Sequence, residues 1–173
     1  MITRTATTAA LCLLLSSSAL AGETRTDTVY TSFSSDDMHM LLTQMGVEHE
    51  RTHDSYGDPL FHCQMGGLNV NIYFYECAAM GVEEGQPKSN AAGCKAVQMH
   101  AGFSVGTPPT AARMNEWNKT MRHIRGYLGD GGSIHAESDL DVSGGVSVKS
   151  VQGFIETFNR MMPRFAEHIG FSS

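Results

Sequence analysis

The chain has few basic residues, and only its N-terminal part contains a long apolar run. It carries 12 lysines and arginines against 18 aspartates and glutamates, which gives a formal net charge of -6 over 173 residues. A nucleic-acid-binding protein would show a basic stripe, and this sequence has none. Beyond the N-terminal residues no stretch approaches the roughly 20 apolar residues that a membrane span needs. We therefore expect neither nucleic acid nor membrane as a partner of the mature chain.

Motifs of enzyme active sites are also lacking. We find no phosphate-binding loop, no paired carboxylates and no arrangement of nucleophile and base. His62 and Cys63 are adjacent, but neighbouring side chains on a strand point to opposite faces, so the two cannot form a catalytic pair. We expect a protein that is not an enzyme and needs no cofactor, and we keep a hydrolase only as a third alternative.

The N-terminal residues have the pattern of a secretory signal. Arg4 precedes an apolar run over residues 9–15, a serine-rich stretch and then Ala19-Leu20-Ala21. These are the charged region, the hydrophobic region and the A-x-A cleavage site of a signal peptide. We predict a signal peptide over residues 1–21 that is cleaved between Ala21 and Gly22, and hence a periplasmic or secreted protein.

The cysteines fit an oxidising compartment. Of the four in the chain, one lies in the predicted signal, so three remain and at least one of them is not paired within the molecule. Strand alternation places Cys77 and Cys94 on one outer face, at the two ends of a glycine-rich connection. The same alternation turns Cys63 toward the core, where a thiol behaves as a small hydrophobe. We predict a Cys77–Cys94 disulfide and a reduced, buried Cys63.

Hydrophobic periodicity predicts three helices and six strands in one domain. A first helix starts after Ser34 and ends at Gly46, a second starts at 107–110 and carries its apolar stripe to Ile124, and a third covers 148–169. The expected strands cover residues 47–53, 60–65, 68–77, 94–103, 125–128 and 133–142. Residues 22–33 form a polar leader, and residues 78–93 form an irregular excursion between strands. This order favours an α+β fold, in which helices pack on one face of an antiparallel sheet.

Several short motifs span most of the mature chain. They are Gly57-Asp58-Pro59, Tyr73-Phe74-Tyr75, Ala101-Gly102-Phe103, Asn115-Glu116-Trp117-Asn118, Tyr127-Leu128, and Asp139-Leu140-Asp141 before Gly144-Gly145. As a set they resemble the YbjN-domain family, described as bacterial sensory transduction regulators. The resemblance implies a single domain over residues 34–171 with a fold like that of type III secretion chaperones, and it implies no catalytic residues.

The third strand carries the best candidates for partner contact. Tyr73 and Tyr75 fall on its non-core face, and Gln98 and His100 fall on the same face of the fourth strand. Aromatic side chains among polar ones suit a protein or peptide interface. The alternative is that the excursion over residues 78–93 covers this face. The leading hypothesis is a chaperone-like binding module for a protein or peptide partner, with a homodimer also open.

Two metal hypotheses are weaker. His49 and His53 share one strand face, His62 lies on the neighbouring strand and His39 lies among methionines, which would suit copper or zinc. The zinc type of close ligand spacing is absent, however, and the methionines fit helix stripes. A periplasmic copper- or zinc-binding protein remains the alternative function. His135, Glu137, Asp139 and Asp141 alternate along one strand and could bind calcium, but such a run is more often a solvated face.

Overall fold

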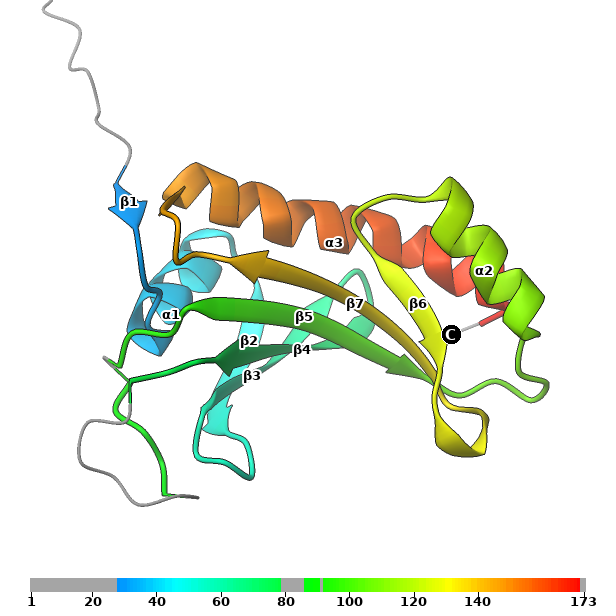
Figure 1. The fold of residues 1–173 in the computed structure, drawn as a ribbon, viewed down its shortest axis with the longest axis horizontal. Coiled ribbons are helices and arrows are strands. Elements are labelled where there is room, and N and C mark those ends of the chain that lie inside the picture. The colour runs from blue at the N-terminus through cyan, green and yellow to red at the C-terminus, as the bar shows by residue number, and fades with distance from the viewer. Residues whose placement is uncertain (1–27, 79–85, 91, 172–173) are drawn as a thin grey trace, which may run out of the picture.

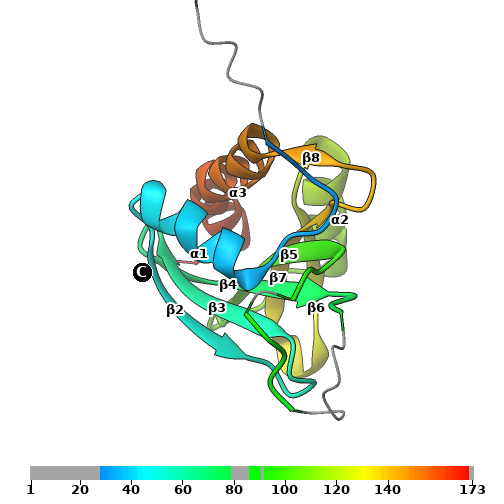
Figure 2. The ribbon, with the colours of Figure 1, turned by 90° about the vertical axis from the view of Figure 1, so that its left-hand side faces the viewer.

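The fold has two layers, a curved antiparallel sheet and three helices on one of its faces (Figures 1 and 2). The computed structural model describes residues 28–78, 86–90 and 92–171. Six strands form the main sheet in the order β2-β3-β4-β5-β7-β6, and every neighbouring pair is antiparallel. The predicted α+β class, with helices on one face of the sheet, is confirmed.

The elements follow the expected order closely. The helices are α1 (Ser35–Gln44), α2 (Ala111–Thr120) and α3 (Val148–Ile169). The strands of the main sheet are β2 (Glu48–His53), β3 (Pro59–Met65), β4 (Leu68–Tyr75), β5 (Ala96–Phe103), β6 (Arg125–Leu128) and β7 (Ile134–Asp141). A short 3-10 turn, Asp130–Gly132, joins β6 to β7, and β1 (Val29–Tyr30) pairs with β8 (Val146–Ser147) in a small second sheet.

Local chemistry explains where the first helix begins and ends. Ser34 accepts a hydrogen bond from the backbone N–H of Asp37, and the Asp37 carboxylate accepts one from the backbone N–H of Ser34 at 2.9 Å. This is the capping box that the sequence predicted. At the other end Gly46 adopts a φ of +69°, a left-handed conformation that glycine adopts without strain, and the chain turns into β2.

The core lies between the sheet and the helices. The strand residues predicted to face the helices are all buried: Phe61, Met65, Val70, Ile72, Phe74, Val97 and Met99. From the helix side, Trp117, Phe158 and Phe165 are also fully buried. The Trp117 and Phe165 rings meet edge to face with centroids 5.0 Å apart, which is a favoured aromatic geometry.

Two details of the predicted helix stripes are wrong. Helix α2 ends at Thr120 because Met121 is already extended, so Ile124 belongs to the segment that leads into β6. Ile124 is still buried, and its carbonyl accepts a hydrogen bond from Trp117 Nε1 at 3.0 Å. Helical spacing would place Phe154 fully in the core beside Phe158, but it is only partly buried and packs against the core from the rim of α3.

The Cys77–Cys94 disulfide is present, with an S–S distance of 2.08 Å, but it does not lie on the outer face. Glu76 has a φ of +54°, which interrupts the strand alternation just before Cys77. Cys94 is fully buried and lies in a β-bridge opposite Phe33. Both sulfurs therefore pack on the core side, so the outer-face argument that led to this pair is wrong. Cys63 is free and buried, and burial raises the pKa of its thiol to about 12.

The residues before α1 are partly described. Residues 28–33, expected as part of a polar leader, contain the short strand β1 and end at Phe33, which is 1% exposed. The predicted signal peptide and its cleavage site at Ala21 and Gly22 lie outside the described residues. Within the described part of the chain, no helix has the length and apolar character to cross a membrane.

Candidate functional site on the open face of the sheet

Every second residue of the main sheet points away from the helices. In β4 and β5 the register places Asn71 opposite His100, Tyr73 opposite Gln98 and Tyr75 opposite Ala96. We call the surface built from these residues and their neighbours in β6 and β7 the open face. Among the described residues, no helix packs against it, because α1, α2 and α3 all lie on the other side (Figure 2).

The structure brings the four predicted partner-binding residues together. The Tyr75 hydroxyl donates a hydrogen bond to Gln98 Oε1 at 3.2 Å, and the rings of Tyr73 and His100 meet edge to face with centroids 6.0 Å apart. Tyr75 is 41% exposed, whereas Tyr73, Gln98 and His100 are half-buried. The four residues therefore form one continuous patch on two adjacent strands.

The described part of the excursion lies beside this patch rather than on it. Gln86 approaches the β2–β3 turn so closely that a Cβ at Gly57 would lie 1.9 Å from its carbonyl oxygen. The Lys88 ammonium forms an ion pair with Asp58 at 2.6 Å, and Asn90 contacts the start of α1 through its carbonyl and side chain. The alternative that the excursion covers Tyr73 and Tyr75 falls in part on residues 79–85 and 91, which lie outside the described residues.

The patch continues into β6 and β7 through residues that were not predicted as partner-binding. Glu137 is 7% exposed and lies at the centre of this extension. Its Oε2 accepts hydrogen bonds from Arg125 Nε at 3.0 Å and Nη2 at 2.6 Å, and its Oε1 accepts one from the Tyr127 hydroxyl at 2.6 Å. The Gln98 amide donates to Asp139 Oδ1 at 2.7 Å, which joins this cluster to the Tyr75 patch.

Two histidines connect the cluster to Tyr73. His100 Nε2 lies 2.9 Å from His135 Nδ1, and the His135 ring stacks on Tyr127 with centroids 4.9 Å apart. His135 Nε2 in turn lies 3.0 Å from the Ser133 hydroxyl. His100 Nδ1 is buried and has no hydrogen-bond partner among the described residues.

Burial and hydrogen bonding set the charges of the open face. Burial opposes ionisation of Glu137, but hydrogen bonds from Tyr127 and Arg125 outweigh it and lower the pKa of its carboxyl group. Burial, together with the hydrogen bond to Glu137, raises the pKa of Tyr127 to about 12. Burial and the nearby His135 lower the pKa of His100. At neutral pH the face therefore presents an Arg–carboxylate pair, phenols and a neutral His100.

Of the histidines of the copper or zinc hypothesis, only His39 and His49 come together. His49 and His53 point toward the helix side of the sheet, where His49 Nε2 lies 2.8 Å from His39 Nδ1. His62 points the opposite way and contacts Asn71 Oδ1 at 2.8 Å. Among the described residues, no group of three or more histidine, cysteine, aspartate or glutamate side chains could hold a metal ion.

The acids of the calcium hypothesis do share one strand face, as the alternation predicted. Their oxygens, however, accept hydrogen bonds from protein donors: Glu137 from Arg125 and Tyr127, and Asp141 from Ser143. His135, Glu137, Asp139 and Asp141 thus form part of the polar network of the open face. The pairing of β5 with β7 makes them neighbours of Gln98 and His100, and a prediction of strand order would have found them.

A family model described as "YbjN: putative bacterial sensory transduction regulator" matches residues 34–171. The chain belongs to the YbjN family. The match begins at the Ser34 cap of α1 and ends just after α3, so it contains the whole open face. A comparison with curated proteins found no match.

Proposed function

We propose that this member of the YbjN family acts in sensory transduction as a non-enzymatic binding module, and that it engages a protein or peptide partner through the open face. The observation that carries the proposal is the continuous patch from Tyr75 through Gln98 and His100 to Tyr127. Tyrosine is enriched at protein interfaces because it combines a large rigid contact area with a polar end.

The hydrogen-bond network supports this role. Tyr75 bonds to Gln98 and Tyr127 bonds to Glu137 in the unbound chain, so these side chains lose little conformational freedom on binding. The thiol of Cys63 does not contribute to this face, because it faces the core and burial keeps it protonated. Aromatic and polar side chains that are already ordered are suited to recognition of a partner.

We further propose that the protein works in the periplasm. The Cys77–Cys94 disulfide supports this location, because disulfides persist in oxidising compartments. Intact-mass measurement of protein from a periplasmic fraction is expected to show Gly22 as the first residue. Retention of Met1 would contradict the proposed export.

The partner proposal is tested by capture from periplasmic extract with the immobilised mature protein. We expect a specific partner to be retained by the natural protein and lost by the Tyr75→Ala/Gln98→Ala variant. Glu156→Ala is the matched control, since Glu156 is exposed on α3, on the opposite side of the molecule. Equal capture by the natural protein and the open-face variant would contradict the proposal.

A further inference from the structure

One edge of strand β7 is paired with another strand along only half of its length. The strand runs over Ile134–Asp141, but β6 pairs with it only as far as Glu137, where Arg125 lies opposite. The other edge of β7 pairs along its whole length with β5. In the described part of the chain, no strand pairs with residues 138–141 on the β6 side. An unpaired edge of this kind is a template for another strand.

The chain departs from this edge at His123. His123 has a φ of +72°, a left-handed conformation that is uncommon outside glycine but that histidine, like asparagine and aspartate, adopts more often than most residues. It lies just before Ile124, whose carbonyl is bonded by the buried Trp117 indole. A chain that stayed extended here would continue β6 along β7. The turn at His123 instead carries the chain away and leaves the edge unpaired.

The free backbone groups can be assigned from the neighbouring hydrogen bonds. The carbonyl of Ser133 accepts a bond from Gly129 N on the β6 side, whereas Val142 N donates to Lys95 on the opposite side. Alternation along an antiparallel strand then directs the N–H and C=O groups of Asp139 and Asp141 toward the free edge. An added strand would find two donors and two acceptors there.

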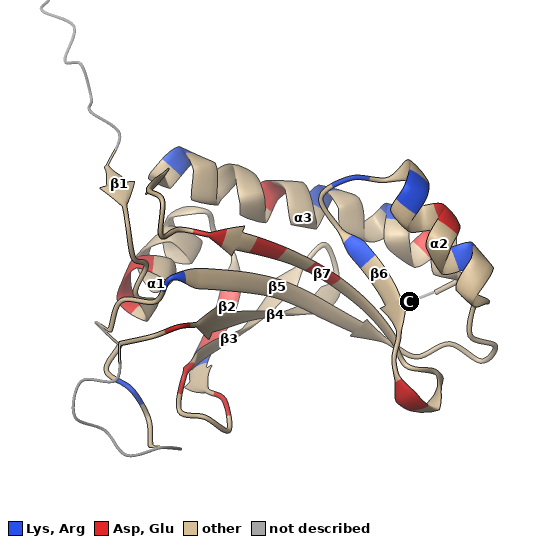
Figure 3. Ribbon diagram, viewed as in Figure 1, with Lys and Arg blue, Asp and Glu red and all other residues tan. Residues whose placement is uncertain are grey.

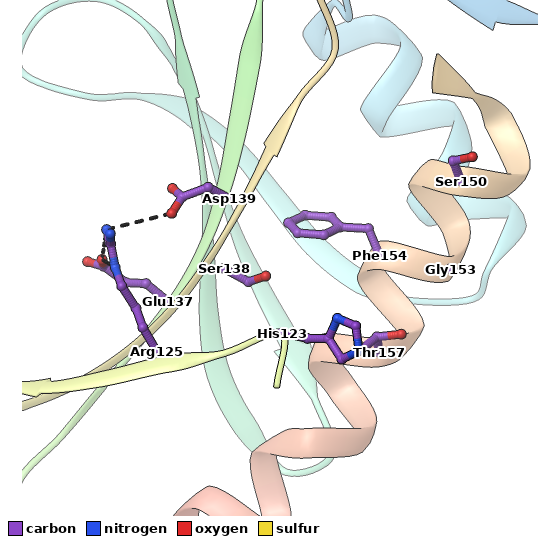
Figure 4. A pocket seen from close by; sticks show the side chains of 9 residues that line it. All are labelled: His123, Arg125, Glu137, Ser138, Asp139, Ser150, Gly153, Phe154 and Thr157. Carbon is purple, nitrogen blue, oxygen red and sulfur yellow. Dashed lines mark hydrogen bonds and ion pairs between the residues drawn. The ribbon is translucent and has the colours of Figure 1, made fainter. Parts of the chain in front are cut away.

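A groove runs beside this edge, between β7 and the first half of α3 (Figure 4). Its helix wall presents Gly153, the half-exposed ring of Phe154, and Thr157. A Cβ placed on Gly153 would meet no atom within 4 Å, so packing within the described chain does not require a glycine there. Glycine inside a helix is destabilising, and its effect here is to leave room beside Phe154.

We propose that this edge and groove bind an extended basic peptide, which adds to β7 as a strand in line with β6. Its alternate lysine or arginine side chains would lie on the open-face side opposite Asp139 and Asp141. The apolar side chain between them would enter the groove at Phe154 and Gly153. The site touches the Tyr75 patch at Asp139, which accepts a hydrogen bond from Gln98, but it lies at the edge of the sheet and does not depend on the partner proposed for that patch.

The molecule already contains this pairing one step earlier along β7. Arg125 lies directly opposite Glu137, bonds its carboxylate at 2.6 Å and reaches Asp139 Oδ2 at 3.6 Å, so a basic residue at the next position of the same pattern would add to the positive charge beside Asp139 and extend it toward Asp141. Figure 3 shows the acids that follow one another along β7. Asp141 is kept charged because hydrogen bonds from Ser143 lower the pKa of its carboxyl group.

Charge also argues against a second copy on this edge. Antiparallel pairing of two β7 edges would bring Asp139 and Asp141 against the same residues of the other copy. Like charges directly opposite one another destabilise a strand pair. A basic strand from another molecule removes this repulsion.

The test uses the full mature protein, labelled for amide hydrogen exchange, and three blocked hexapeptides. One alternates lysine and valine, the second has glutamate in place of lysine, and the third is the lysine–valine peptide N-methylated at alternate residues. We expect only the first to slow the exchange of the Asp139 and Asp141 amides, by about tenfold or more at saturation. Equal binding of the N-methylated peptide would show attraction by charge alone and would overturn the proposal.

Two variants sharpen the test. Asp139→Asn/Asp141→Asn keeps the side-chain shape and should reduce the preference for lysine over glutamate peptide at least about fivefold. Tyr56→Ala should leave peptide binding unchanged, because Tyr56 is exposed in the turn between β2 and β3, away from the edge and the groove. Amides of Asp139 and Asp141 that are protected before any peptide is added would mean that the chain's own residues, or a second copy, already occupy the edge. Such protection without peptide, or an unchanged preference for the lysine peptide in Asp139→Asn/Asp141→Asn, would overturn the proposal.

Discussion

The two faces of the sheet have the same strands but opposite chemistry. In β4, Val70, Ile72 and Phe74 have no exposed surface beneath the helices, whereas Tyr75 on the open face is 41% exposed. The covered face holds the fold together by apolar burial. The open face is ordered by hydrogen bonds such as that from Tyr127 to Glu137. A change on the covered face should therefore cost stability, and a change on the open face should mainly affect recognition.

Among the substitutions that test this comparison, Phe158→Ala should cause the largest loss of stability. Phe158 is fully buried on α3, and emptying such a site costs about 3 to 5 kcal/mol. Denaturant unfolding of the two proteins measures the difference. The paired variant Tyr75→Ala should lower the free energy of unfolding by no more than about 1 kcal/mol. Similar losses for both variants would mean that the open face carries part of the core.

Removal of the disulfide should cause the next largest loss of stability. Cys77 and Cys94 are separated by 17 positions, and closing a loop of that size should contribute about 3 kcal/mol by restricting the unfolded chain. Cys77→Ser/Cys94→Ser should lose that amount in thermal or denaturant unfolding. Cys63→Ser is the control for loss of a thiol. Non-reducing peptide mapping that finds Cys63 in a cross-link would contradict the assignment.

A smaller effect is expected from the buried charge of the open face. Glu137→Gln should cost about 1 to 3 kcal/mol at neutral pH, because Arg125 and Tyr127 lose a charged acceptor. The folded pKa of Glu137 lies below its ordinary value of 4.5, so its charged form stabilises the fold above that pH. This stabilisation is lost as the pH falls through the folded pKa. The difference in free energy of unfolding between the natural protein and Glu137→Gln should therefore become smaller in acid. A difference that does not change with pH would exclude the charge of Glu137 as its cause.

The smallest test compares two glycines. Gly153→Ala should raise the free energy of unfolding by about 0.5 to 1 kcal/mol, because alanine favours a helix and the new Cβ enters open space. Gly126→Ala should lower it by about 1 to 3 kcal/mol, since its Cβ would lie 2.5 Å from the Phe165 ring. Thermal unfolding of both variants measures these changes, and a destabilised Gly153→Ala would show that the groove is filled.

Local chemistry made much of the fold predictable. The cap at Ser34, the strand over residues 125–128 and the helix over residues 148–169 were predicted at or close to their observed bounds, because each is marked by periodicity and by residues that cap, turn or break the chain. The Tyr73, Tyr75, Gln98 and His100 patch also followed from alternation on two strands that pair directly.

What could not be predicted depends on tertiary context. The pairing of β5 with β7 brings Glu137 beside His100, and no local pattern reports that strand order. The short β1–β8 pair joins residues more than 100 positions apart. The left-handed conformations at Glu76 and His123 were not predicted, because they are uncommon outside glycine and neither residue is part of a turn motif.

The disulfide also makes the segment from Cys77 to Cys94 a covalent ring that closes between β4 and β5. A peptide bond cut anywhere between the two cysteines would leave the molecule in one piece, with Tyr73 still opposite Gln98. Residues could likewise be inserted within the ring without changing the register of the two strands. The ring is thus the place where this fold can accept a foreign sequence, such as an affinity tag or a protease site, beside its open face.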